Sequence, residues 1–346
     1  MDDKDINDVV SQIKSKQKDL ANLKGAVVIA LKGNNNLSDL EKQIIQNISV
    51  AIIRKTMSAS NFLMSDDNSI LQNAVSLRYV LEILITITLM NKEEEYKFIN
   101  YIAFYNSQED TQKIIIQELE REKNTLENYA KIYFEKTASF IEKNQKSLTL
   151  EEQGAILDDL IDKYIEREFF IIGTKQNLED NTFGGLADLI DIAIIPKYKE
   201  KIKKLDETKK EIAKVLRNEP IIKKCFPKIG NQESRVFKEI KDKKGKNGRA
   251  RSWFEKAKDA GLEGEYNFIY KYTSNLSHFI SYSSETKSNY DNLDEKFMVL
   301  NRLNSYLNKI YDNLKIFSQV SSETIDFCKE FGNVADMGDD NEKPNE

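Results

Sequence analysis

The sequence predicts an all-α fold, and two observations support this class. Glycine and proline are scarce, with 13 and 4 residues among 346, whereas turn-rich β architectures use many more of both. Apolar residues recur at helical spacing along most of the chain. Because the chain is long for one hydrophobic core, we expect either two packed lobes or one elongated multi-helix bundle.

The composition limits the compartment and the partners. The 52 Lys and Arg residues against 57 Asp and Glu give a net charge of −5, which argues against a chain that binds polyanions over its whole surface. The two cysteines, Cys225 and Cys328, form no CxxC pair. Their spacing excludes a disulfide framework or a zinc site as an organising feature and favours the reducing cytosol. We expect a cytoplasmic protein that needs no cofactor.

The ends of the chain and its apolar runs predict neither a signal peptide nor a membrane span. Residues 1–5 are acidic and lead into a charged helix, unlike a secretory signal. The longest apolar run, residues 83–90, is far shorter than the roughly 20 residues that a bilayer requires. Residues 335–346 are acidic and poor in apolar side chains, so we expect a disordered tail.

The N-terminal part, residues 1–66, is predicted to be a pair of antiparallel helices. The second helix begins after Ser38, an N-cap whose capping-box partner is Glu41, and runs to Met57. Such a pair is a common start for a helical bundle. We assign residues 67–334 to the main bundle, with a basic insertion at about 197–251.

A helix over residues 69–90 is apolar almost all round, which predicts that other helices surround it. Arg78 and Glu82, one turn apart, interrupt this pattern. Each buried charge costs several kcal/mol unless it is well paired. The two residues therefore either pair with each other and with a third group, or line a cavity.

The remaining helices follow from the same periodicity. We expect them over residues 96–105, 108–144, 148–172 and 292–331. The long charged helix is expected to pack within its own chain, with a homodimer contact as the alternative. A short helix that contains Trp253 ends at Gly261, whose missing side chain suits a C-cap.

Residues 197–251 contain 20 Lys and Arg but only 8 Asp and Glu, a local net charge of +12. This excess predicts a surface for phosphate groups. The alternative is a solvated helix face followed by a basic loop. The Gly-Lys pairs lack the glycine spacing of a P-loop. The candidate nucleic-acid contacts are Lys243, Lys244, Lys246, Arg249 and Arg251.

The segment 266–279 holds His278, the only histidine of the chain, and histidine is the residue type whose ordinary pKa lies near neutrality. Tyr270, Ser274 and His278 follow one another at four-residue intervals, so they share a helix face that Lys271 flanks. Either a site is built around His278, or it is a buried histidine hydrogen-bonded to a neighbour. No carboxylate lies one turn away on either side, so we expect no metal site.

Three pieces of the chain together resemble a bacterial helical family named domain of unknown function 5677. They are the helix over residues 74–82, the segment 253–266 with its short helix ending in Gly-Leu, and the spacing of Tyr270, Ser274 and His278. That family is similar in outline to the HEPN superfamily, whose members are helical bundles. Many of those are metal-independent ribonucleases in toxin–antitoxin and phage-defence systems.

The resemblance implies a metal-independent endoribonuclease that acts as a toxin or effector in phage defence. An active HEPN site has an arginine and a histidine on one helix with a short spacer between them. Here the nearest cation upstream of His278 is Lys271, so we infer that Arg78 supplies the guanidinium from the neighbouring helix.

In this hypothesis His278 transfers a proton at the ribose or at the leaving oxygen, while Arg78 and Lys271 hold the phosphate as charge develops on it. The basic insertion brings in RNA without sequence preference. The candidate catalytic set is His278, Arg78, Glu82, Ser274, Tyr270 and Lys271.

The alternative hypothesis is a non-catalytic sensor or adaptor in a defence system, with a partner protein from the same operon. Its Arg, Glu, Ser and His cluster is then a structural network that fixes helix register. A binder of a small phosphorylated ligand ranks last, because the stripe has no glycine-rich cradle. The effect of removing His278 separates the first two, since an alanine there unfolds a buried network but not a catalytic site.

Overall fold

The computed structural model describes residues 3–65, 70–167, 170–278 and 293–331, and all regular secondary structure in these ranges is helical. The all-α class is therefore confirmed for the described part of the chain. The predicted tail at residues 335–346 lies outside it.

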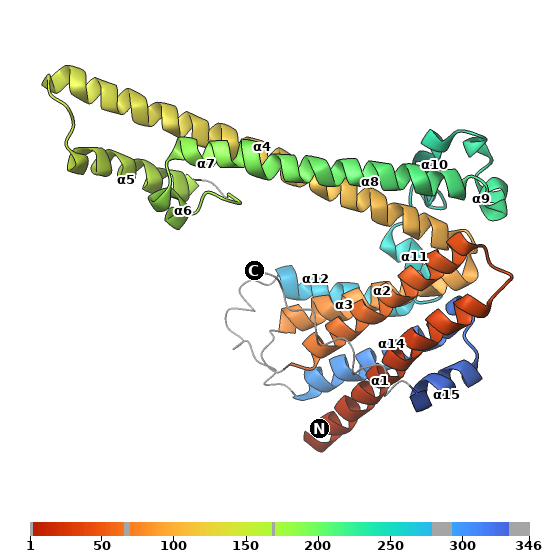
Figure 1. Cartoon of the computed structure of the whole chain (residues 1–346). Coiled ribbons are helices and arrows are strands. Elements are labelled where there is room, and N and C mark those ends of the chain that lie inside the picture. The colour runs from red at the N-terminus through yellow and green to blue at the C-terminus, as the bar shows by residue number, and fades with distance from the viewer. Residues whose placement is uncertain (1–2, 66–69, 168–169, 279–292, 332–346) are drawn as a thin grey trace. The chain divides into compact units, whose positions relative to one another are not determined.

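The chain folds into two compact units, shown in Figure 1. The first unit combines residues 1–102 with residues 215–346, and the second consists of residues 103–214. The second unit is therefore inserted between two segments of the first. The boundary expected at residue 66 falls inside the first unit.

In the first unit, α1 (Asp3–Gly33) and α2 (Asp39–Leu63) form the expected helix pair. Ser38 Oγ accepts a hydrogen bond from the Glu41 backbone N–H at 3.1 Å, and the Glu41 carboxylate accepts one from the Ser38 N–H. This confirms the capping box. Glu41 also accepts a hydrogen bond from Lys97 Nζ at 2.8 Å, so the cap is tied to a second helix.

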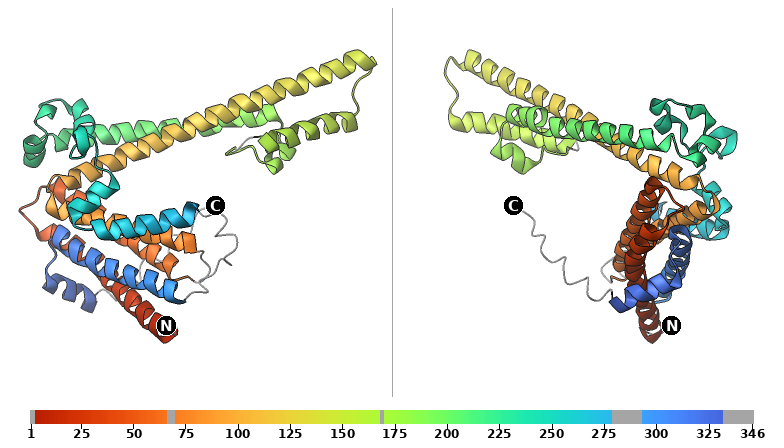
Figure 2. Two further views of the ribbon diagram at one scale, coloured as in Figure 1. Left: turned by 180° about the vertical axis from the view of Figure 1, so that it is seen from behind. Right: turned by 45° about the vertical axis from the view of Figure 1, so that its right-hand side comes forward.

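The centre of the first unit is α3 (Ile70–Lys92). Figures 1 and 2 show it among the helices against which it packs, which are α2, α11 (Trp253–Ala260), α12 (Glu263–His278) and α14 (Leu293–Ser318). The expectation that other helices surround α3 holds for most of its surface but not for one face, where Val75 is 52% exposed and Tyr79 is 40% exposed. One face of α3 reaches the surface because its helical neighbours leave that side uncovered.

The helix predicted over residues 292–331 is two helices, α14 and α15 (Ser322–Phe331). Gln319 between them has a φ of 55°, outside the helical region. Ser321 Oγ accepts a hydrogen bond from the Thr324 N–H at 3.2 Å, so a serine cap starts the second helix. The break also lets Gln319 accept a hydrogen bond from the Asn34 side chain at 2.7 Å.

Short elements of the first unit lie between α8 (Ile195–Leu216) and α11 in the chain. They are α9 (Pro220–Cys225), η2 (Pro227–Ile229), α10 (Glu233–Glu239) and η3 (Lys246–Gly248). Ser252 and Glu255 form a capping box at the start of α11, and Gly261 ends it with a φ of 80°. The predicted glycine C-cap is confirmed.

The second unit contains most of α4 (Tyr96–Asn144), a single helix of 49 residues. We expected two helices here. The residues between them, Asn106 and Ser107, lower helix propensity only slightly compared with glycine or proline, so the helix continues through them. The other helices of the unit are α5 (Leu150–Arg167), α6 (Lys175–Asp180), α7 (Phe183–Leu189), η1 (Ile190–Ile194) and most of α8 (Ile195–Leu216).

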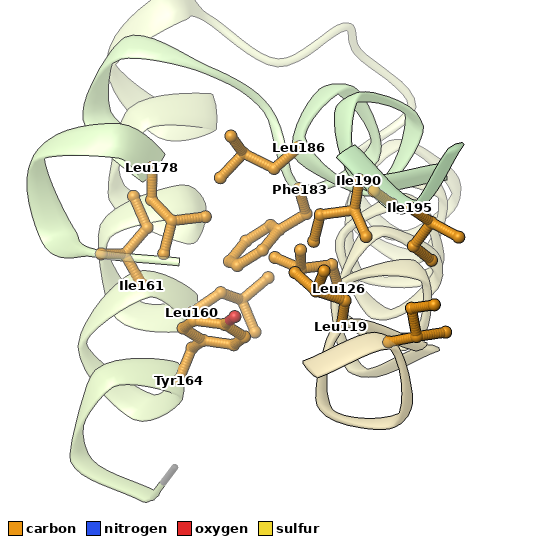
Figure 3. Packing of buried hydrophobic residues seen from close by; sticks show 12 residues of the cluster. Leu119, Leu126, Leu160, Ile161, Tyr164, Leu178, Phe183, Leu186, Ile190 and Ile195 are labelled. Atoms are coloured by element: carbon orange, nitrogen blue, oxygen red, sulfur yellow. The ribbon is translucent and has the colours of Figure 1, made fainter. Parts of the chain in front are cut away.

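Twelve buried residues form the core of the second unit. Figure 3 shows Phe183 pointing into the centre of this cluster, with Leu160 and Tyr164 on one side and Leu126 on another. The Tyr164 ring also stacks on Phe170 at 4.1 Å between centroids. The helices of this unit therefore have a hydrophobic core of their own.

A buried carboxylate orders the chain that follows α5. Glu122 of α4 is 1% exposed and accepts hydrogen bonds from three consecutive backbone N–H groups, those of Ile171, Ile172 and Gly173, at 3.0, 2.8 and 2.5 Å. Backbone donors in a buried loop need such partners. Glu122 therefore provides hydrogen-bond acceptors for backbone N–H groups that no helix pairs.

One stretch of the described residues, Leu71–Lys92, is long and apolar enough to cross a membrane by length and composition alone. Within the fold, 61% of its most apolar window is buried. This is the burial of a core helix, which passes the same test.

Candidate functional site

Helices α3 and α12 run antiparallel. Lys92 Nζ donates a hydrogen bond to the Asp259 carbonyl near one end of the pair, and the Arg78 guanidinium lies 5.4 Å from the centroid of the Tyr270 ring further along. Tyr266, one turn before Tyr270, lies close enough to Arg78 for the guanidinium charge to act on the pKa of its phenol. The helices thus meet through one arginine and two tyrosines.

The two charges within α3 pair with each other. Arg78 Nε donates a hydrogen bond to Glu82 Oε1 at 3.0 Å, and both side chains are partly exposed. The sequence predicted either that Arg78 and Glu82 pair with each other beside a third group or that they line a cavity. The structure has the first arrangement, with a tyrosine as the third group. Burial raises the pKa of Tyr266, while Arg78 acts against this increase, so the phenol stays neutral beside the ion pair.

The surroundings of this ion pair are apolar and exposed. Val75 and Tyr79 lie on the same face of α3 as Arg78 and Glu82, and Tyr270 of α12 is 48% exposed. We call the surface made of Val75, Arg78, Tyr79, Glu82 and Tyr270 the α3–α12 face. Nothing in the sequence marked Val75 and Tyr79 except their spacing from Arg78.

The other candidates on α12 lie further along the helix. Lys271 is exposed and Ser274 is partly buried. His278 is the last residue of α12 and its side chain lies outside the described part of the structure. At 1.5 Å per residue its backbone is about 12 Å along the axis from Tyr270.

The pairing of α3 with α12 also shows how far Arg78 lies from His278 along the helix axes. Because Arg78 is level with Tyr270, the antiparallel course places His278 level with residue 70, where α3 begins. Arg78 contacts the residues of α12 that precede His278 by two turns or more. The structure therefore brings together Arg78, Glu82 and Tyr270, and it sets the His278 backbone apart from them.

Carboxylates pair with most of the predicted phosphate-binding cations. Lys243 Nζ lies 3.0 Å from a Glu239 oxygen, and Lys244 Nζ lies 2.9 and 2.8 Å from oxygens of Glu93 and Glu95. These contacts neutralise much of the positive charge that composition alone assigned to the loop.

The two arginines of the loop are paired as well. Arg249 lies 3.1 Å from the Glu255 carboxylate. The Arg251 side chain is 1% exposed and donates hydrogen bonds to Asp242, Glu93 and Asp259 at distances between 2.7 and 3.1 Å. A guanidinium so enclosed has no face left for a phosphate.

Lys246 is the remaining cation of the predicted set. Its side chain is exposed, and no carboxylate within the described ranges pairs with it. Its backbone N–H donates a hydrogen bond to Glu255 at 3.4 Å. Of the five predicted cations, Lys246 is thus the one whose side chain has no carboxylate partner among the described residues.

Sequence reasoning missed Lys256. Its ammonium group lies 4.7 Å from the centroid of the Trp253 ring, and burial lowers the pKa of this lysine. Asp242 and Glu82 act in the opposite direction on the same group. The charge of Lys256 is therefore influenced both by Arg251 with its partner Asp242 and by Glu82 of the α3–α12 face. The only signal was its i+3 spacing from Trp253 in a capped helix.

No group of three or more His, Cys, Asp and Glu side chains among the described residues is placed to hold a metal ion. Comparisons with family models, with curated proteins and with solved structures find no match for this chain.

Proposed function

We propose that the chain is a non-catalytic helical interaction module that binds a partner protein through the α3–α12 face. The observation that supports this function best is the internal pairing of Arg78 with Glu82, surrounded by the exposed side chains of Val75, Tyr79 and Tyr270. A phosphate-binding site needs uncompensated positive charge. This face presents a balanced ion pair on an apolar surface.

The composition of the face is that of a binding hot spot. Tyrosine and arginine dominate such sites, where they combine large contact area with hydrogen-bond donors. The five residues sit on two packed helices, so they lose little freedom when a partner orders them. The hydroxyls of Tyr79 and Tyr270 and the remaining donors of Arg78 suit a partner that offers apolar side chains next to carbonyl or carboxylate oxygens.

Site-specific photo-crosslinking in the native host tests this function. With benzoylphenylalanine in place of Tyr79, we expect one discrete protein adduct. Tyr270→Ala should reduce the adduct by more than about tenfold, the usual loss for one hot-spot aromatic. Ile316 of α14, which is 66% exposed, provides both the control position for the crosslinker and the control substitution Ile316→Ala. The same adduct from both positions, or an adduct that Tyr270→Ala leaves intact, contradicts the proposal.

An endoribonuclease is the second candidate function. It is favoured by the two cations Arg78 and Lys271 beside the exposed Tyr270, on the helix that ends with His278. Incubation of the purified chain with single-stranded RNA and a metal chelator separates the candidates. The interaction module leaves RNA intact. A ribonuclease cleaves it, and His278→Ala lowers the rate by about 100-fold or more without changing the melting temperature.

A further inference from the structure

A groove of about 550 Å³ lies between α4 and α7 of the second unit. Its floor is made of small residues, Ala130, Gly184 and Ala187. A Cβ atom built on Gly184 has no heavy atom within 4 Å. Among the described residues, no side chain occupies the space next to Gly184.

A large aromatic side chain stands at the rim of this groove. Phe134 of α4 lines it and is 70% exposed. Ala138 and Ile141 continue the same face of α4 along the next two turns, and both are exposed. Neighbouring exposed apolar side chains on one helix face are a feature of interaction surfaces.

Phe134 and the groove lie side by side on one surface. Two copies of this surface are therefore complementary to each other. A two-fold axis placed between them carries each Phe134 into the groove of the other copy, and only an isologous contact has this property. To match this surface in the same way, a partner of different sequence would need both an aromatic side chain for the groove and a recess for Phe134. A second copy of this chain already has them.

The charges on the same rim fit the same symmetry. Lys131 and Glu135 line the groove one turn apart on α4, both well exposed, and their mutual contact is loose at 3.8 Å. When two α4 helices cross antiparallel near Phe134, Lys131 of each copy faces Glu135 of the other. Opposite charges then meet twice across the axis.

We infer that this groove is a self-association site, in which two copies of the chain pair through α4 and each Phe134 occupies the groove of the other. The inference does not depend on the function proposed for the α3–α12 face, which belongs to the other unit. A dimer presents two such faces to a partner.

Sedimentation velocity of the full chain over a range of concentrations tests the inference. We expect a monomer–dimer equilibrium whose dissociation constant rises by more than about tenfold in Phe134→Ala, because two hot-spot aromatics are lost per dimer. The matched control is Ile114→Ala, an apolar residue of the same helix that is 59% exposed and lies about 30 Å away. A chain that is monomeric at all concentrations overturns the inference.

Two further variants separate a lost contact from a lost fold. Gly184→Leu places a side chain at the groove, where its Cβ meets no heavy atom within 4 Å, and should give a monomer that remains folded. Lys131→Glu should weaken the dimer by placing like charges opposite each other, and the double variant with Glu135→Lys added should restore it. Association that persists in Gly184→Leu, or that the double variant fails to restore, overturns the proposed geometry.

Discussion

Arg251 is the most buried cation among the described residues, with 4% of the whole residue exposed. In the sequence it belongs to a basic loop, and its type and position favour phosphate binding. In the structure its guanidinium meets Glu93, which lies 158 residues earlier. A charge buried in this way is stable only with partners in good geometry. Its neighbours therefore make Arg251 a residue that holds the fold together.

We expect Arg251→Met to lower the free energy of unfolding of the first unit by about 3–5 kcal/mol, because it leaves buried carboxylates without a partner. The reporter is the fluorescence of Trp253, the only tryptophan of the chain, during urea denaturation. Lys246→Met in the same loop is the control and should change stability little, since that side chain is exposed. Equal stability of the two variants would show that the carboxylates tolerate the loss of the guanidinium.

At the level of elements, the sequence marked the start of α2 and the end of α11 correctly, whereas α2 continues to Leu63 instead of ending at the predicted Met57. A Ser followed by Glu three residues later starts α2, a glycine ends α11, and these signals act within a few residues, so tertiary contacts do not alter them. The other failures were of two kinds. The continuity of α4 through Asn106 is not marked by the weak local preferences there. The break at Gln319 was missed although Ser321 supplies a local cap for the helix that follows it.

The capping box of α11 predicts a specific pH dependence. Hydrogen bonds from the Ser252 backbone and side chain lower the pKa of Glu255 from 4.5 to about 2. A carboxyl group whose pKa is depressed by folding adds stability above its unfolded pKa, and this contribution is lost as pH falls through the folded value. Glu255 therefore stabilises the fold above about pH 4.5, and the contribution disappears between there and about pH 2.

We expect the melting temperature of Glu255→Gln to depend less on pH between 6 and 3 than that of the parent chain, because glutamine caps the helix without titrating. The measurement is thermal denaturation followed by circular dichroism at several pH values. Ile316→Ala, which replaces an exposed apolar residue of α14 that does not titrate, is the control and should keep the pH dependence of the parent. A parallel shift of the whole Glu255→Gln curve would mean that the cap contributes without its charge.

At the scale of the whole molecule, the division into units was not visible in the sequence. We expected a boundary at residue 66 and a basic insertion at about 197–251, whereas the compact inserted unit is residues 103–214. Its boundaries fall inside α4 and α8, two continuous helices. A boundary without a turn or a composition change leaves no local signal, because only the grouping of contacts defines it.

Two separate cores predict that one unit can be loosened without the other. Phe183→Ala should cost the second unit about 3–5 kcal/mol, the usual loss for a buried phenylalanine. Hydrogen exchange followed by mass spectrometry should then show faster exchange in residues 103–214 and unchanged protection in α3 and α14. Leu307→Ala in the buried face of α14 is the reciprocal control, expected to affect the first unit. Uniform acceleration across the chain in both variants would mean that the units unfold together.

The sequence by itself determined the helical class, the capped helix ends and the choice of Arg78, Glu82 and Tyr270 as notable polar groups on apolar helices. Each of these follows from local spacing and from the cost of burying charge. Only the tertiary structure decided that Arg78 pairs with Glu82 beside Tyr266, that Arg251 is enclosed by carboxylates, and that Phe134 stands beside an empty groove. These outcomes depend on which helices become neighbours, and residues distant in sequence reveal that only when the chain is folded.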